Sequence, residues 1–440
     1  MNSVLAVRVF AVILMVVVFG VAIHAPVTIY LSTHFPDWEL VIKSWKELLL
    51  GLATVILLVE VARRQMFGQF LRDRIIQMLL AYAGLHFVLA ALIPNSVSAI
   101  GAGLLIDLRY LLFFTLVYCG VRLVPNLRVT FLRVVMVGAG VILGFALLQM
   151  FVLPRDILAN IGYGPDTIAP YLTVDDNEDY VRINSTLRGP NPLGAYAVII
   201  FAIVVAAATK FGGRLRSDQH LVTGIAVAAS CLMLIVSYSR SALLALLIAT
   251  GAIVAHISGA RISKKLVGMC AGILVAVSLL FITFAGNPVV SHIVWHDDPN
   301  GGGRVDSNQE HVNSLIDGTE RMVSQPFGAG IGSTGSASLL SDKPIVIENQ
   351  YLFTAHEVGW LGLGLFIWLF VTIMRQLWRA RASALALGVF ASGLGLAAIG
   401  ILLPVWVDDT VSIVWWGLAA LGVGGWEMGN RKGGKYARKN

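Results

Sequence analysis

Charged residues are scarce in this sequence. Asp, Glu, Lys and Arg make up 13% of the 440 residues, while hydrophobic residues make up 57%. Soluble globular domains usually carry about 25% charged residues. The shortage of charge therefore excludes an ordinary soluble protein and predicts a polytopic membrane protein.

Cysteine is also rare, and its spacing argues against two kinds of site. The three cysteines lie far apart, within or at the ends of apolar stretches, which indicates structural thiols rather than a disulfide framework or a cysteine metal site. One other group of metal-ligating residue types lacks the spacing of a zinc site; it comprises His292, His296, Asp297 and Asp298. We therefore expect no metal and no other cofactor.

Long apolar stretches dominate the chain. A helix needs about 20 apolar residues to cross a hydrocarbon core of roughly 30 Å. About twelve stretches qualify, at residues 4–24, 44–62, 75–94, 99–121, 131–153, 192–209, 219–237, 241–257, 266–285, 350–374, 382–404 and 410–428. The first has no convincing cleavage site and is expected to stay as a helix. The sequence predicts an all-α fold with about twelve transmembrane helices in a single transmembrane domain, residues 1–440.

The distribution of Lys and Arg predicts the orientation, because basic connections stay in the cytoplasm. Every second connection is basic, and so is the C-terminal tail. The basic residues are Arg63, Arg64, Arg72, Arg74, Arg122, Arg128, Arg133, Lys210, Arg214, Arg216, Arg261, Lys264, Lys265, Arg375, Arg379, Arg381, Arg431, Lys432, Lys435, Arg438 and Lys439. Both termini are therefore expected in the cytoplasm. The net charge of +7 requires no nucleic acid, and the tail is expected to contact membrane lipids.

Two polar connections fall on the outer side, at residues 154–191 and 286–349. In the longer one, the apolar residues between Asn308 and Val323 have the spacing of a short amphipathic helix. The following QPFGAGIGSTGS lacks the strand, the helix and the Lys-Ser/Thr pair of a nucleotide-binding loop. Any chemistry is expected where these connections meet the outer helix ends.

Two arginines on the outer side lack a topological explanation. Arg188 lies in STLRGPNPLGAY, where Pro190 and Pro192 stop any helix. Arg240 heads an apolar stretch, where the helix dipole disfavours a cation. A bound anion would compensate both charges, so they predict an anion clamp. For Arg188, contact with lipid headgroups is the alternative.

Two aspartate-containing groups allow both a structural and a functional interpretation. Asp107 and Arg109 lie within one span, where a charged pair is costly and faces the interior of a bundle. Asp408 and Asp409 precede the last span, where they either cap its helix or orient a catalytic group.

The motifs follow one another in a recognisable order. The sequence reads LRY, LRGPNPLGAY, SRSALLAL, a long outer loop ending in PFGAGIG, and NQYLFTAHEVGWLG. This order, from about Ile106 to Phe370, resembles the O-antigen ligase and polymerase superfamily of bacterial inner-membrane glycosyltransferases of the GT-C type. The last family motif usually starts with His-Asn. Here Glu348 takes the place of that histidine, and the rest of the motif is kept in Asn349, Tyr351, Leu352, Glu357, Gly359 and Gly362.

The resemblance implies an O-antigen ligase, which transfers O-polysaccharide from undecaprenyl pyrophosphate to the lipid A-core at the periplasmic face. Transfer would invert the anomeric carbon without a metal. Arg188 and Arg240 would hold the departing pyrophosphate. Glu348 would accept the acceptor proton, with His356 as the competing candidate and Asp408 as an orienting group. The expected substrate-binding residues are Arg109, Arg182, Asn191, Asn349, Tyr351 and Arg321.

Two other functions remain open. An O-antigen polymerase uses the same donor and extends a chain that stays on undecaprenyl pyrophosphate. A lipid-linked sugar transporter would use intramembrane charges such as Asp107 and Arg109. An enzyme is favoured because the polar residues gather at one membrane face and no pair of broken helices is evident in matching halves. One dominant outer loop favours the ligase.

Overall fold

The computed structural model describes most of the chain between residues 3 and 437. The residues within that range that it does not describe are 125, 155, 165, 169–172, 175–176, 212, 214–216, 260–306 and 343.

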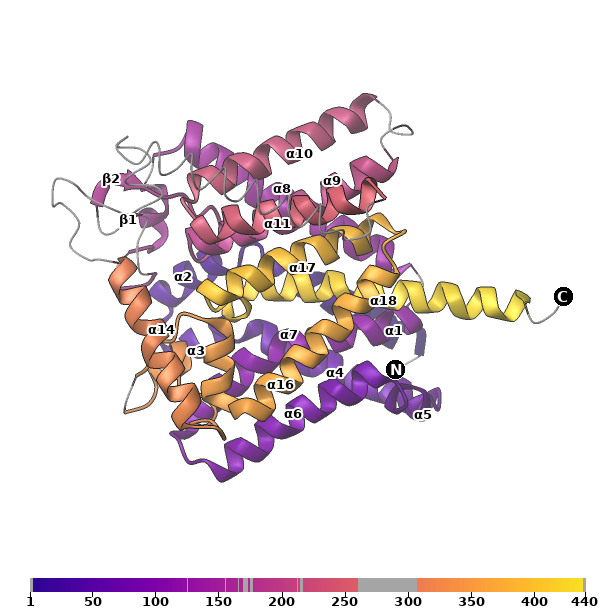
Figure 1. The fold of residues 1–440 in the computed structure, drawn as a ribbon, viewed down its shortest axis with the longest axis horizontal. Helices are drawn as coiled ribbons and strands as arrows, with labels where there is room; N and C mark the ends of the chain where they lie inside the picture. The colour runs from indigo at the N-terminus through magenta and orange to yellow at the C-terminus, as the bar shows by residue number, and fades with distance from the viewer. Residues whose placement is uncertain are drawn as a thin grey trace.

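Long apolar helices form the body of the protein (Figure 1). Eight of those described are long and apolar enough to cross a membrane: α6 (Arg74–Leu92), α7 (Val97–Leu123), α8 (Leu127–Phe151), α9 (Pro190–Phe211), α10 (Ser217–Val236), α11 (Arg240–Ile257), α16 (Gln350–Arg379) and α17 (Ala384–Leu402). A ninth is formed if α1 (Ser3–Gly20) and α2 (His24–His34), which meet at 85°, count as one span. The protein is therefore an all-α polytopic membrane protein.

The predicted number of twelve spans is not reached in the described part of the chain. α4 (Trp45–Arg63) and α18 (Asp409–Ala437) cover two further predicted stretches. However, α4 carries Lys46, Glu47 and Glu60, and the apolar part of α18 is short. The predicted stretch at residues 266–285 lies outside the described residues. The figure of twelve stays a prediction.

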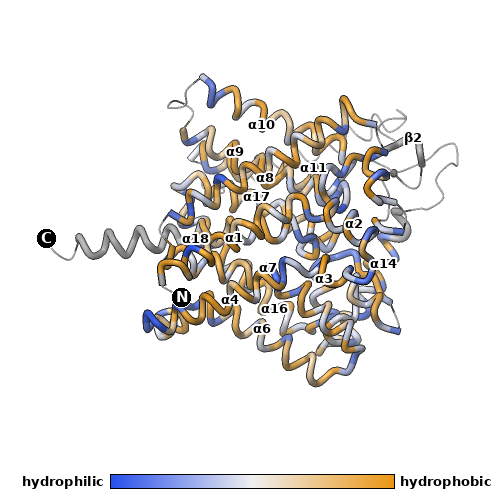
Figure 2. The backbone as a smooth tube through the Cα atoms, turned by 180° about the vertical axis from the view of Figure 1, so that it is seen from behind, coloured by the Kyte–Doolittle hydropathy of each residue, from blue (hydrophilic) through white to orange (hydrophobic). Residues whose placement is uncertain are grey.

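The shorter elements gather at the two ends of the helices. They are η1 (Pro36–Trp38), α3 (Glu39–Lys43), α5 (Phe67–Leu71), η2 (Ile157–Ile161), β1 (Thr173–Val174), β2 (Asn177–Val181), α14 (Ser307–Ser324), α15 (Gly335–Ser338) and η5 (Val405–Val407). α2, α14 and the antiparallel β1–β2 pair lie at one end, here named the loop end. α5 and both termini lie at the other, the terminal end (Figures 1 and 2).

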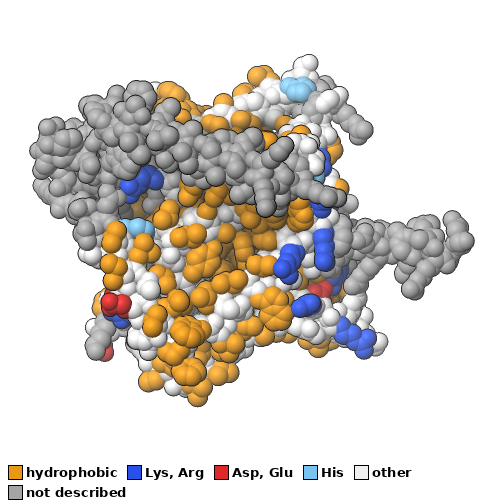
Figure 3. All heavy atoms as spheres, in the orientation of Figure 1, with side chains coloured by type: hydrophobic (Ala, Val, Ile, Leu, Met, Phe, Trp, Pro, Cys, Tyr) orange, Lys and Arg blue, Asp and Glu red, His pale blue; other side chains and the backbone are white. Residues whose placement is uncertain are grey.

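The surface between the two ends is hydrophobic. Figure 3 shows hydrophobic side chains over the middle of one face, with Lys and Arg gathered toward the terminal end. This distribution fits helices whose middle parts face lipid and whose basic connections lie on one side.

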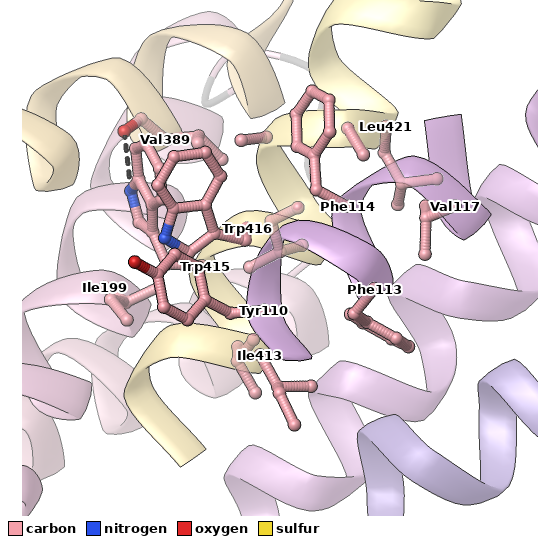
Figure 4. Close-up of a cluster of buried hydrophobic side chains, with 14 of the residues drawn as sticks. Tyr110, Phe113, Phe114, Val117, Ile199, Val389, Ile413, Trp415, Trp416 and Leu421 are labelled. Carbon is pink, nitrogen blue, oxygen red and sulfur yellow. Dashed lines mark hydrogen bonds between the residues drawn. The ribbon is translucent and has the colours of Figure 1, made fainter. Parts of the chain in front are cut away.

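The core lies where α18 packs against α7 (Figure 4). Trp415 and Trp416 are completely buried, and the indole Nε1 of Trp415 donates a 3.2 Å hydrogen bond to the carbonyl of Val389. The ring of Tyr110 lies 5.3 Å from that of Trp416. This packing fixes the start of α18 relative to α7, and both helices carry charged residues at the loop end.

α16 is broken at Gly359, a feature that the sequence analysis did not anticipate. Gly359 has φ +67°, and the amide of Trp360 donates to the carbonyl of Pro326 over 2.9 Å. The amide of Ala329 bonds the carbonyl of His356 over 2.6 Å. The segment from Pro326 to Ala329 thus supplies partners for the backbone groups that the break in α16 releases.

Candidate functional site

The bend between α1 and α2 positions the first residue of the candidate site. Its released carbonyls are satisfied by hydroxyl groups from elsewhere: Thr410 Oγ1 donates to Val21 over 2.8 Å, and Thr186 Oγ1 donates to Ala22 over 2.6 Å. Because these backbone groups keep partners, the chain can turn by 85° inside the bundle. The turn places His24 beside the first residue of α18.

Five side chains form a charge cluster at the loop end, defined here as His24, Lys46, Glu47, Arg109 and Asp409. The Asp409 carboxylate contacts Arg109 and lies 2.9 Å from Lys46 Nζ and 3.1 Å from His24 Nε2. Glu47 Oε1 lies 3.3 Å from Lys46 Nζ and 3.6 Å from Arg109 Nη1. Lys46 and Arg109 are buried. The cluster therefore ties α2, α4, α7 and α18 together.

The hydrogen bonds of His24 determine its tautomer. The indole of Trp45 donates to His24 Nδ1 over 3.0 Å, so Nδ1 holds a lone pair and the ring proton lies on Nε2. Nε2–H then donates to Asp409. The two cationic side chains Lys46 and Arg109 equal the carboxylates of the charge cluster in number.

Arg109 was predicted to bind substrate and, on the structural interpretation, to pair with Asp107. The predicted pairing of Asp107 with Arg109 is wrong. Arg109 contacts the carboxylate of Asp409 and donates to the carbonyl of Val407 over 2.5 Å. Asp107 Oδ2 instead lies 3.8 Å from His86 Nε2. Residues two apart on a helix point to different sides. Arg109 thus links α7 to α18 within the charge cluster.

Arg188 projects from a rigid loop that precedes α9. Its neighbours Asn184, Ser185 and Thr186 are buried, and Ser185 has φ +53°. The Ser185 hydroxyl donates to Ile142 over 2.6 Å, and its amide donates to Gln149 over 3.1 Å. The buried polar groups fix the backbone, while the Arg188 side chain is exposed.

Arg182 and Asn191, both predicted to bind substrate, contact each other. Arg182 Nη2 donates to Asn191 Oδ1 over 2.7 Å, and Arg182 Nε donates to the carbonyl of Ser237 over 2.9 Å. These bonds fasten the loop before α9 to the connection between α10 and α11.

Arg240 is the first residue of α11 and is exposed. α9 and α11 pack directly on each other, and a Cβ placed on Gly194 would lie 2.7 Å from that of Ala242. Arg188 and Arg240 therefore stand at the same end of two neighbouring helices. Each helix start adds partial positive charge to that end.

Asp408 caps α18. Its Oδ1 accepts a 2.9 Å hydrogen bond from the amide of Val411. Burial raises the pKa of Asp408, while the bond from Val411 and the charges of Arg188 and Arg109 act in the opposite direction. Asp408 thus lies within the electrostatic reach of Arg188, and its role as an orienting group stays a prediction.

Glu348 lies on the loop end, just before α16, and is partly exposed. Its Oε2 lies 2.8 Å from His311 Nδ1, and its amide donates to Ser314 Oγ over 3.0 Å. Both partners belong to α14, which occupies the stretch predicted to be an amphipathic helix. The sequence analysis missed His311; its place within that predicted helix was the one available indication.

The predicted residues Asn349 and Tyr351 connect α16 to α17. The Asn349 side chain accepts from the amides of Tyr351 and Leu352, and it donates to the carbonyl of Ile401 over 2.6 Å. Tyr351 Oη donates to the carbonyl of Ala397 over 2.9 Å. In this structure their polar atoms hold the start of α16 in place.

The described hydrogen bonds and ion pairs of His356 and Arg321 do not involve Arg188, Arg240 or the charge cluster. The ring of His356 is completely buried, so a molecule that approaches from solvent cannot reach either ring nitrogen in this structure. Arg321 Nε forms a 2.8 Å ion pair with Asp317 one turn earlier on α14.

Lys46 and Glu47 are members of the charge cluster that the sequence-based predictions did not include. Both lie inside a predicted span, where ionisable residues are costly and indicate a site or a structural joint.

Comparison with protein-family models and with curated proteins gave no match to this chain. The fold and the charge cluster define a class: a polytopic membrane protein with a charged site at its loop end.

Proposed function

We propose that the protein is a glycosyltransferase of the bacterial inner membrane, an O-antigen ligase that transfers O-polysaccharide from undecaprenyl pyrophosphate to the lipid A-core. One observation carries the proposal: Arg188 and Arg240 are both exposed at the loop-end starts of adjacent helices. A lipid-linked pyrophosphate presents its charge at the membrane boundary, which is where such a pair would meet it.

The arginines suit the leaving group. A guanidinium binds phosphate oxygens through two parallel hydrogen bonds and keeps its charge at physiological pH. When the bond between the anomeric carbon and the pyrophosphate oxygen breaks, its electron pair stays on that oxygen. Arg188 and Arg240 would stabilise this growing charge more strongly than the charge of the bound donor, which lowers the barrier.

The acceptor would approach from the side of Glu348. Gln350, two residues later, accepts a 2.9 Å hydrogen bond at Oε1 from the amide of Trp406, and Trp406 lies two residues before Asp408. This contact joins the segment that carries Glu348 to the segment that carries Asp408. Attack by the acceptor hydroxyl opposite the pyrophosphate would invert the anomeric carbon, and arginine charge would serve where other transferases use a metal.

Reconstitution tests the proposal. The purified protein in liposomes receives an undecaprenyl-pyrophosphate-linked glycan and a lipid A-core acceptor, and the products are separated by gel electrophoresis. A ligase joins the glycan to lipid A-core. Lengthened glycan that remains on undecaprenyl pyrophosphate would identify a polymerase instead. Movement of donor across the bilayer without a new glycosidic bond would identify a transporter.

A deletion strain gives the matching result in cells. Loss of a ligase leaves rough lipopolysaccharide and accumulated lipid-linked polymer. Loss of a polymerase leaves a core with a single repeat unit. Smooth lipopolysaccharide of normal length in the deletion strain would contradict both.

A further inference from the structure

His311 and Glu348 form a hydrogen-bonded pair at the loop end. His311 Nδ1 lies 2.8 Å from Glu348 Oε2. A carboxylate can only accept hydrogen bonds, so Nδ1 carries the proton of this contact. In the neutral ring, Nε2 then holds the lone pair. This is the tautomer that a histidine needs in order to take a proton from a hydroxyl group.

The rest of α14 fixes this pair. Ser314 Oγ, one turn after His311, accepts a hydrogen bond from the amide of Glu348. At Gly318, a further turn along, an added Cβ would lie 3.2 Å from side-chain atoms of Ile347 and Leu352, so α14 lies close to these residues. These positions share one face of a helix. The same face of α14 therefore holds the backbone and the side chain of Glu348, so the imidazole has a defined direction.

Both side chains can be reached from outside. The His311 side chain is 24% exposed and that of Glu348 is 41% exposed, whereas the His356 ring is completely buried. Of the two histidines that the structure describes near the start of α16, His311 is thus the one that a sugar hydroxyl could approach.

We propose that His311 is the catalytic base of the transfer and that Glu348 is its positioning residue. This rests on the proposed glycosyltransferase function. The acceptor hydroxyl gives its proton to His311 Nε2, and its oxygen forms the bond to the anomeric carbon. The bond to pyrophosphate breaks, and its electron pair leaves with the pyrophosphate. His311 afterwards returns the proton to water.

The chemistry favours a histidine in this role. An imidazole titrates near neutral pH and accepts a proton more readily than a carboxylate does. A carboxylate on Nδ1 stabilises the imidazolium that forms during the reaction and holds the ring in the correct tautomer.

Single-turnover transfer in the liposome assay tests the proposal. We expect His311→Ala to lower the rate by about 100-fold or more, as the loss of a general base does. Added imidazole should restore part of the rate. The variant should also lose the dependence of the rate on pH that a general base gives. Glu348→Gln should weaken transfer less, and Glu348→Asp should recover part of the loss.

Two controls separate the possible outcomes. His34→Ala removes another exposed loop-end histidine, which contacts the carbonyl of its own helix, and should leave the rate unchanged. Donor binding should be normal in His311→Ala, and the folded yield is checked by gel filtration. If wild type transfers and His311→Ala matches its rate and pH profile, the base assignment is wrong. If wild type itself transfers nothing, the proposed function fails first.

Discussion

Lys46 Nζ lies 2.9 Å from the carboxylate of Asp409, in an environment that leaves the lysine almost no contact with solvent. The two residues come from helices far apart in the sequence. The same carboxylate contacts Arg109, so one aspartate joins α4 and α7 to α18. A charge buried in this way is tolerated only while its partners are present.

Removal of Lys46 should therefore destabilise the protein strongly. We expect Lys46→Met to lower the free energy of unfolding by about 3–5 kcal/mol, because it leaves a buried carboxylate short of a partner. Unfolding in detergent, followed by intrinsic tryptophan fluorescence, measures the change. Lys43→Met is the matched control, because Lys43 pairs with Glu39 on the surface and should matter by less than about 1 kcal/mol. Equal losses would contradict the role of the charge cluster.

The break in α16 predicts opposite effects for two glycines of the same helix. Gly359 has φ +67°, and a Cβ there would lie 2.6 Å from the backbone of Pro326 and Phe327. Gly359→Ala should cost about 1–3 kcal/mol from the backbone conformation alone. At Gly364 a Cβ meets open space, so Gly364→Ala should be neutral or should stabilise by up to about 1 kcal/mol. Thermal unfolding of both variants checks this; a stable Gly359→Ala would show that the break is not needed.

Asp408 predicts a pH dependence of stability. Burial raises its pKa above the ordinary value of 3.8, so the folded protein binds this proton more tightly than the unfolded chain does. Its contribution to stability therefore falls as the pH rises above that value. Asp408→Asn keeps an oxygen to cap Val411 and does not titrate. The variant should gain stability relative to wild type as the pH rises above about 4. If the unfolding midpoint of Asp408→Asn fell relative to that of wild type as the pH rose, the assignment would be contradicted.

Eight of the predicted stretches coincide with helices long and apolar enough to cross a membrane, because the length of an apolar stretch is a local property. It also singled out Arg188 and Arg240, since a cation at the outer start of a span departs from the usual charge distribution. Lys46 escaped notice because it lies inside an apolar stretch, and its partner Asp409 becomes its neighbour only through folding.

The remaining differences also come from tertiary contacts. The break at Gly359 depends on Pro326, whose carbonyl replaces a helical partner. The role of His311 depends on how α14 docks on the start of α16. Asn349 and Tyr351, expected to bind substrate, use their polar atoms for contacts with α17. A sequence motif records that such residues occur together, but it does not distinguish a ligand contact from a helix contact.

We propose above all that Arg188 and Arg240 hold the departing pyrophosphate. The most direct test is single-turnover glycan transfer by Arg188→Ala and Arg240→Ala in liposomes, with Arg379→Ala, an exposed arginine in the last turn of α16, as the control. We expect each loop-end variant to fold normally and to lose about 100-fold to 1000-fold in rate, as when a charge-stabilising donor is removed, while the control transfers normally. Wild-type rates in both loop-end variants would contradict the claim.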